Sequence, residues 1–111
     1  MRISFGARRL AREFSSARVL DRSYGRDMAG KIRARMAVLE AAPNLAKVPT
    51  TKPDRCHQLE GERRGKFAVD LVHPHRLVFE PDHDPIPRRP DGGIDLAAIT
   101  AITIIEIVDY H

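Results

Sequence analysis

The chain has 111 residues, of which 42% are hydrophobic and 31% charged, and its formal net charge at pH 7 is +4. This length suffices for one domain with a modest core. No apolar run approaches the roughly 20 residues that span a bilayer, and the first residues lack the apolar stretch of a secretory signal. Cys56 is the single cysteine, so an internal disulfide is excluded and a reducing compartment is favoured. We therefore expect one cytoplasmic domain, residues 1–111, that does not enter the membrane.

Charge is distributed unevenly along the chain. Residues 1–66 contain 16 Lys and Arg against 7 Asp and Glu, whereas residues 67–111 contain 3 against 8. A basic half of this kind indicates a polyanionic partner such as nucleic acid. It is also typical of solvated helix faces, so charge alone leaves both interpretations open.

The N-terminal part of the chain predicts one short strand and two helices. Residues 2–5 are short enough to form an edge strand. Across residues 7–17, apolar side chains recur at spacings of three and four, which predicts one face of a helix. Residues 21–25 break this pattern, and a second helix is expected over residues 26–42, where Pro43 ends it. Because the two helices are close in sequence, we expect them to form a hairpin.

The second half of the chain predicts short strands separated by turns. Strands are expected at residues 57–60, 67–72, 75–80 and 101–108, with a turn at residues 61–66. The last of these strands is apolar on both faces apart from Thr103 and Glu106. It should therefore lie inside a sheet that helices cover on one face.

One long segment interrupts the strands. Residues 81–93 contain four prolines and the pair Gly92-Gly93, and we interpret them as an irregular, flexible surface loop. Residues 95–98 are expected to form a helical turn. Helices followed by a meander of strands are typical of an α+β domain. We expect the helical hairpin to pack on one face of a small, mostly antiparallel sheet, with the other face left free for a partner.

Four short segments carry a further signal. They are His57-Gln58-Leu59-Glu60-Gly61, Gly65-Lys66-Phe67-Ala68-Val69, Arg76-Leu77-Val78-Phe79 and Asp109-Tyr110-His111. In this order and spacing they resemble the RelE/ParE toxin superfamily of bacterial toxin–antitoxin modules, and most closely its HigB-like branch. The chain departs from that pattern at His75, where relatives often carry Trp or Tyr, and at residues 81–93, where relatives have a short turn.

The resemblance implies a RelE/ParE-like fold and a ribosome-dependent endoribonuclease. Such an mRNA interferase cuts mRNA in the ribosomal A site and inhibits translation, with no metal and no other cofactor. The implied partners are the ribosome with its mRNA and a cognate antitoxin, usually of helix-turn-helix, HigA-like type. The complex would contact DNA only through that antitoxin.

Metal-free RNA cleavage needs a base for the 2′-OH, a cation at the phosphate and an acid for the leaving 5′-oxygen. On the motif match, we assign the proton transfers to His57 and His111, since histidine titrates near neutral pH. Tyr110 is expected to orient the 2′-OH or to share that role. Arg76 is assigned to the scissile phosphate, which a guanidinium binds as a fork. Asp109 is expected to orient a His or Arg side chain.

Charge and turn position, rather than a motif, single out three more cations. Lys66 is assigned to the scissile phosphate, and Arg63 and Arg64 to the backbone of mRNA or ribosomal RNA.

Structural alternatives exist for the assigned histidine, the C-terminal residues and the basic turn. A residue such as His57 is often a half-buried packing residue, a terminal Asp-Tyr-His is often an exposed tail, and a basic turn is usually solvated.

Two other functions stay open at this point. ParE-type relatives share the fold but poison DNA gyrase and lack the catalytic histidine. An inactive relative would act with its antitoxin only as a transcriptional co-repressor. A metal site at residues 80–84 with His73 and His75 is disfavoured, because Pro81 and Pro85 interrupt those ligands.

Overall fold

Five strands form one sheet in the computed structural model, which describes residues 1–109. The strands are β1 (Arg2–Phe5), β2 (His57–Gln58), β3 (Phe67–Asp70), β4 (His75–Pro81) and β5 (Ala101–Asp109). They lie in the order β1-β5-β4-β3-β2, and β1 runs parallel to β5 while the other neighbours are antiparallel. The predicted mostly antiparallel sheet is confirmed, with the first strand at an edge and the last strand inside it.

The described residues form three α-helices, whereas the sequence predicted two. They are α1 (Arg8–Glu13), α2 (Ala17–Tyr24) and α3 (Arg26–Ala41). The single helix expected over residues 7–17 is wrong, because Ser16 starts a new helix there. Its side-chain oxygen accepts a hydrogen bond from the Val19 backbone N–H at 3.2 Å, a typical N-cap that competes with a continuous helix. The expected break at residues 21–25 is helical up to Tyr24, and the chain turns at Gly25, whose φ is +81°.

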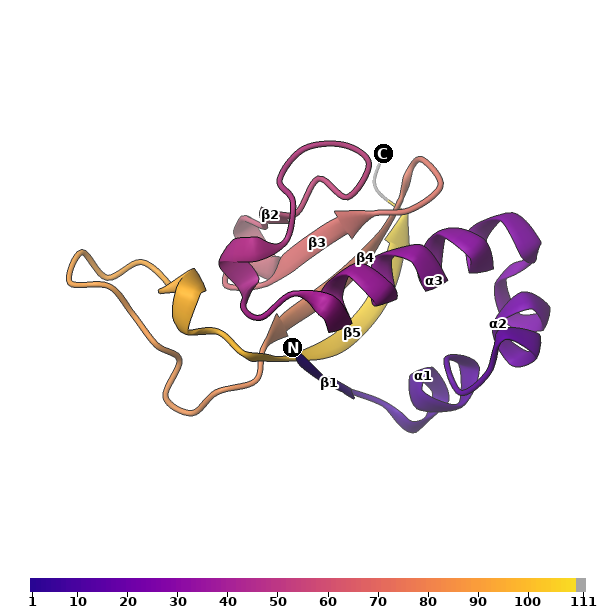
Figure 1. Cartoon of the computed structure of the whole chain (residues 1–111), viewed down its shortest axis with the longest axis horizontal. Helices are drawn as coiled ribbons and strands as arrows, with labels where there is room; N and C mark the ends of the chain where they lie inside the picture. The colour runs from indigo at the N-terminus through magenta and orange to yellow at the C-terminus, as the bar shows by residue number, and fades with distance from the viewer. Residues whose placement is uncertain (110–111) are drawn as a thin grey trace.

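The core lies between α3 and the sheet (Figure 1). Because side chains alternate along a strand, Val69 of β3 and Leu77 of β4 face this core together with Ile32 of α3. The opposite face of the sheet carries a smaller apolar cluster around Ala68 and Val78. The α-helices therefore cover one face of the sheet, and the other face, which we call the uncovered face, has no α-helix of the described residues packed on it.

A buried arginine joins α3 to the strands. Arg35 is 6% exposed, and its Nε donates a hydrogen bond of 2.6 Å to the backbone carbonyl of Asp70. Its Nη1 lies 3.7 Å from a carboxylate oxygen of Asp54, which is also buried. The Asp70 backbone N–H in turn donates to the Asp54 carbonyl at 2.9 Å. One guanidinium thus fixes both the end of β3 and the segment that precedes β2.

The proline-rich segment is more structured than the sequence predicted. β4 continues to Pro81, and Arg88 and Ile94 form an isolated antiparallel bridge near the far end of the segment. Ile94 is buried, so this part of the loop packs against the domain. The expected helical turn is confirmed as a short 3-10 helix, η3 (Leu96–Ala98). Two further 3-10 helices among the described residues are η1 (Leu45–Lys47) and η2 (Gly61–Arg63). The flexibility of residues 81–93 stays a prediction.

We predict that Arg35→Met lowers the free energy of unfolding by about 3–5 kcal/mol, because it leaves the Asp54 carboxylate buried without its cation. Urea unfolding followed by circular dichroism measures the change. Arg33→Met is the matched control, since Arg33 pairs with Asp21 on the exposed side of the same helix and should cost at most about 1 kcal/mol. Equal, small losses in the two variants would contradict a structural role for Arg35.

Candidate functional site

Polar side chains from three adjacent strands meet on the face of the sheet that α3 does not cover. His57 of β2 lies opposite Ala68, and Asp70 of β3 lies opposite Arg76 of β4. These register positions place His57, Asp70 and Arg76 on the same face as Ala68, because residues directly opposite each other in a sheet share a face. The predicted pair His57 and Arg76, 19 positions apart in sequence, is thereby brought together.

The hydrogen bonds of His57 define which ring nitrogen carries the proton. Its Nδ1 lies 2.8 Å from the backbone carbonyl of Arg55. A carbonyl only accepts hydrogen bonds, so Nδ1 carries the hydrogen in the neutral ring. The Nε2 atom then has the lone pair and accepts a long hydrogen bond of 3.4 Å from Arg76 Nη1. His57 is therefore held in the form that can take up a proton at Nε2, beside a guanidinium.

Asp70 links the cations of this site. Arg55 donates two hydrogen bonds to its carboxylate, at 2.8 and 3.1 Å, and Arg76 Nε lies 3.7 Å from the same group. Partial burial opposes ionisation of Asp70, but the hydrogen bonds and the charge of Arg55 and the charge of Arg76 outweigh it and lower the pKa of Asp70. Asp70 is thus a fixed negative charge that holds Arg76 beside His57.

Arg55 has a backbone conformation that residues other than glycine rarely adopt. Its φ is +46°, in the left-handed region. This backbone turns the Arg55 carbonyl toward His57 Nδ1 while its side chain reaches Asp70. Strained backbone of this kind costs of the order of 1 kcal/mol or more and is concentrated at functional sites.

The three cations predicted from charge do not act as one cluster. Arg63 Nε lies 3.5 Å from a carboxylate oxygen of Glu106, whose position opposite Val78 puts it on the uncovered face. Arg64 instead lines a separate pocket at the edge of the sheet. Lys66 is half-buried at the end of the turn, where its backbone hydrogen-bonds to Leu59.

The predicted C-terminal residues are described only in part. Asp109 is the last residue of β5 and lies opposite His75, next to the pair formed by Val108 and Arg76. β5 therefore ends beside the strand that carries Arg76. The assignments of Tyr110 and His111 lie outside the described residues.

Sequence reasoning missed Arg55 and Asp70. One signal was available for Asp70, which is a charged residue in an otherwise apolar strand, in step with Ala68 and out of step with Phe67 and Val69. Arg55 gave no such signal, because its role depends on a backbone turn and on the packing of Asp54.

Neither a metal site nor a membrane span is found in the described part of the chain. Within residues 1–109, no group of three or more His, Cys, Asp and Glu side chains is arranged to hold a metal ion. None of the helices there combines the length and the apolar composition that crossing a membrane requires.

Comparison with known structures defines the class of fold, which the chain shares with a YoeB/ParE toxin. The chain is similar to a YoeB/ParE toxin from Agrobacterium tumefaciens, with a TM-score of 0.55 and 12% identity over 100% of both chains. No protein-family model matches the chain, and no curated protein matches it. At 12% identity the likeness concerns the fold, so the activity has to be argued from the site.

We predict that the stabilising effect of Asp70 depends on pH. A carboxyl whose pKa is lowered on folding contributes stability above its unfolded pKa, here about 3.8, and loses it as the pH falls through the lowered value. The difference in free energy of unfolding between the wild type and Asp70→Asn should be constant above about pH 5 and shrink below about pH 4. Urea unfolding at a series of pH values measures it. Asp84→Asn, an exposed loop variant, should differ little from the wild type throughout, and a constant difference for Asp70→Asn at every pH would contradict the expectation.

Proposed function

We propose that this protein is the toxin of a toxin–antitoxin module and an mRNA interferase that cleaves mRNA in the ribosomal A site. The observation that carries the proposal is the contact between His57 Nε2 and the Arg76 guanidinium on the uncovered face of the sheet. Two further features support it, the RelE/ParE-like fold and the sequence resemblance to the HigB-like branch.

In the proposed reaction, the 2′-OH of one nucleotide attacks the phosphate that follows it. His57 Nε2 takes the proton of the 2′-OH, a bond forms between the 2′-oxygen and phosphorus, and the bond to the 5′-oxygen breaks. The products are a 2′,3′-cyclic phosphate and a 5′-hydroxyl. Arg76 stabilises the negative charge that develops on the phosphate oxygens, and Asp70 keeps its guanidinium in place.

The remaining roles follow the sequence assignments. His111 protonates the leaving 5′-oxygen, Tyr110 orients the 2′-OH, and Asp109 orients a His or Arg side chain. Lys66 binds the scissile phosphate, and the guanidinium groups at the turn bind the RNA backbone. The proposed partners are the ribosome with its mRNA and a cognate antitoxin of the HigA-like, helix-turn-helix type, in the cytoplasm.

We predict that expression of the wild type arrests growth and translation, and that His57→Gln abolishes both effects. Glutamine keeps a hydrogen-bonding side chain but cannot take up the proton, and loss of a general base costs about 10²–10⁴ in rate. Growth and incorporation of labelled methionine measure the outcome. His83→Gln is the matched control, because His83 accepts a hydrogen bond from the Thr100 backbone N–H away from the site.

Two results would contradict the proposed nuclease activity. Growth arrest with an induced DNA-damage response and continuing translation would indicate a gyrase poison of the ParE type. No growth arrest by a folded wild type would indicate a co-repressor. Equal toxicity of the wild type and His57→Gln would remove His57 from the catalytic role.

A further inference from the structure

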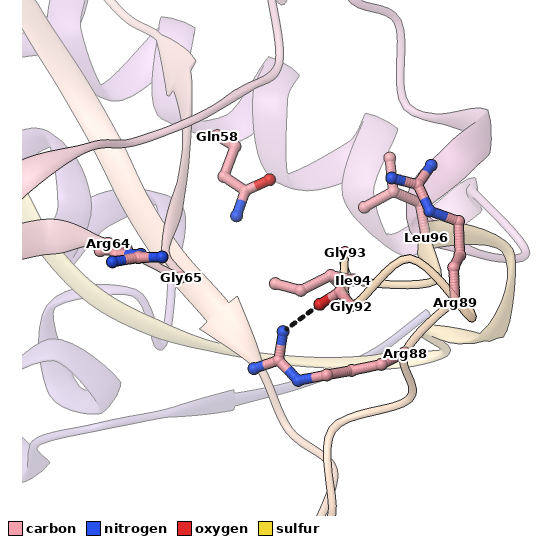
Figure 2. A pocket seen from close by; sticks show the side chains of 9 residues that line it. All are labelled: Gln58, Arg64, Gly65, Arg88, Arg89, Gly92, Gly93, Ile94 and Leu96. Atoms are coloured by element: carbon pink, nitrogen blue, oxygen red, sulfur yellow. Dashed lines mark hydrogen bonds between the residues drawn. The ribbon is translucent and has the colours of Figure 1, made fainter.

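A pocket of about 680 Å³ lies at the edge of the sheet, between the β2–β3 turn and the proline-rich loop. Arginine and glycine dominate its lining, which consists of Gln58, Arg64, Gly65, Arg88, Arg89, Gly92, Gly93, Ile94 and Leu96. Figure 2 shows that the amide of Gln58 and the guanidinium groups of Arg64 and Arg88 extend toward the same space. Arg89 lies on the other side of the loop tip (Figure 2). Two segments distant in sequence thus supply positive charge to one pocket.

Hydrogen bonds within the loop tip hold Arg88 in place. Its Nη1 donates to the Gly92 carbonyl at 3.0 Å, and the backbone N–H of Arg89 donates to the Gly93 carbonyl at 2.7 Å. The Asp95 N–H donates to the Pro87 carbonyl at 2.9 Å, which closes the base of this small hairpin. The loop tip is therefore organised around the residues that line the pocket.

The positive charge of the pocket is largely unneutralised by the protein. Among residues 1–109, no acidic side chain forms an ion pair with Arg64 or Arg88, while Arg89 pairs with the exposed Asp91 at 3.3 Å. A guanidinium presents its N–H groups in a fork that matches the oxygens of a phosphate. Two such forks and an amide donor around one space are suited to an oxyanion.

The edge strand β2 carries one residue of the proposed catalytic site and one residue of the pocket. Gln58 follows His57 directly, and successive side chains of a strand point to opposite faces. His57 lies on the uncovered face, whereas Gln58 lines the pocket. Because β2 is an edge strand of the sheet, an RNA strand that crosses its free edge passes from His57 to the pocket.

We propose that this pocket binds a backbone phosphate of the same RNA strand that is held at His57, with Arg64 and Arg88 as its ligands. This inference rests on the proposed function, because it takes RNA as the ligand of the uncovered face. RNA fits the pocket better than an acidic protein segment does, because an amphipathic segment anchors through apolar side chains and this lining is mainly guanidinium, amide and glycine. The pocket is built partly by residues 88–93, in the segment where this chain departs from the family pattern.

Binding of a fluorescein-labelled 2′-O-methyl oligoribonucleotide, followed by anisotropy from 50 to 300 mM KCl, tests the pocket. The 2′-O-methyl groups remove the nucleophile, so binding is measured without cleavage. Arg88→Ala should weaken binding about tenfold and reduce the slope of log Kd against log salt by about 0.7. The double variant with Arg64→Ala should lose less than the sum of the single losses, because both groups bind one phosphate. Arg88→Lys should restore the salt slope but only part of the affinity.

Arg22→Ala is the matched control, since Arg22 is an exposed cation on α2, at the opposite end of the molecule from the loop (Figure 1). Equal losses of RNA affinity for Arg22→Ala and Arg88→Ala would overturn the proposal that the pocket binds a phosphate. They would leave only a general electrostatic attraction between the basic protein and RNA. Loss of affinity of Arg88→Ala for a labelled deca-glutamate peptide, with RNA binding unchanged, would assign the pocket to an acidic protein partner and also overturn it. The wild type could fail to cleave mRNA on ribosomes while Arg88→Ala still weakens RNA binding. That result would overturn the proposed nuclease activity but not RNA binding by the pocket.

Discussion

The arrangement of the site depends on the contacts that the buried guanidinium of Arg35 makes with two aspartates. Arg35 lies in the middle of α3 and contacts the Asp70 carbonyl and the Asp54 carboxylate. A buried charge has to be fully compensated, because removing one partner leaves the other unpaired in a low-dielectric interior. The helix, the end of β3 and the segment before β2 are consequently held in one relative position. Packing of apolar side chains alone would leave more freedom, since it has no direction.

The proposed catalytic residues are held in place by neighbouring residues that Arg35 fixes. Asp54 is followed by Arg55, whose left-handed backbone directs its carbonyl to His57. Asp70 is held through its backbone by Arg35, so its carboxylate can hold Arg76 next to His57. The interior of the domain is thus connected to the uncovered face through backbone atoms. A functional group positioned in this way loses little entropy when a ligand binds.

Sequence reasoning predicted the sheet better than the helices. The strands followed from alternation and apolar runs, which tertiary packing preserved. The helix expected over residues 7–17 was wrong because Ser16 caps a second helix, a local competition that apolar periodicity does not reveal. In the site, His57 and Arg76 were found through a motif, and the structure brings them together. The contributions of Arg35 and Arg55 could not be predicted, because they depend on contacts between segments far apart in the chain. For the same reason, the loop at residues 81–93 gave no hint that Arg88 would lie near Arg64.

Mapping of mRNA 5′ ends by primer extension tests an RNA-cleaving site at His57 and Arg76 most directly. Purified protein is added to ribosomes programmed with a short message, beside the same RNA without ribosomes and beside the Arg76→Ala variant. We expect new 5′ ends within the A-site codon, only with ribosomes and only with Arg76 intact. Absence of new ends with a folded wild type, or the same ends with Arg76→Ala, would contradict the proposed site.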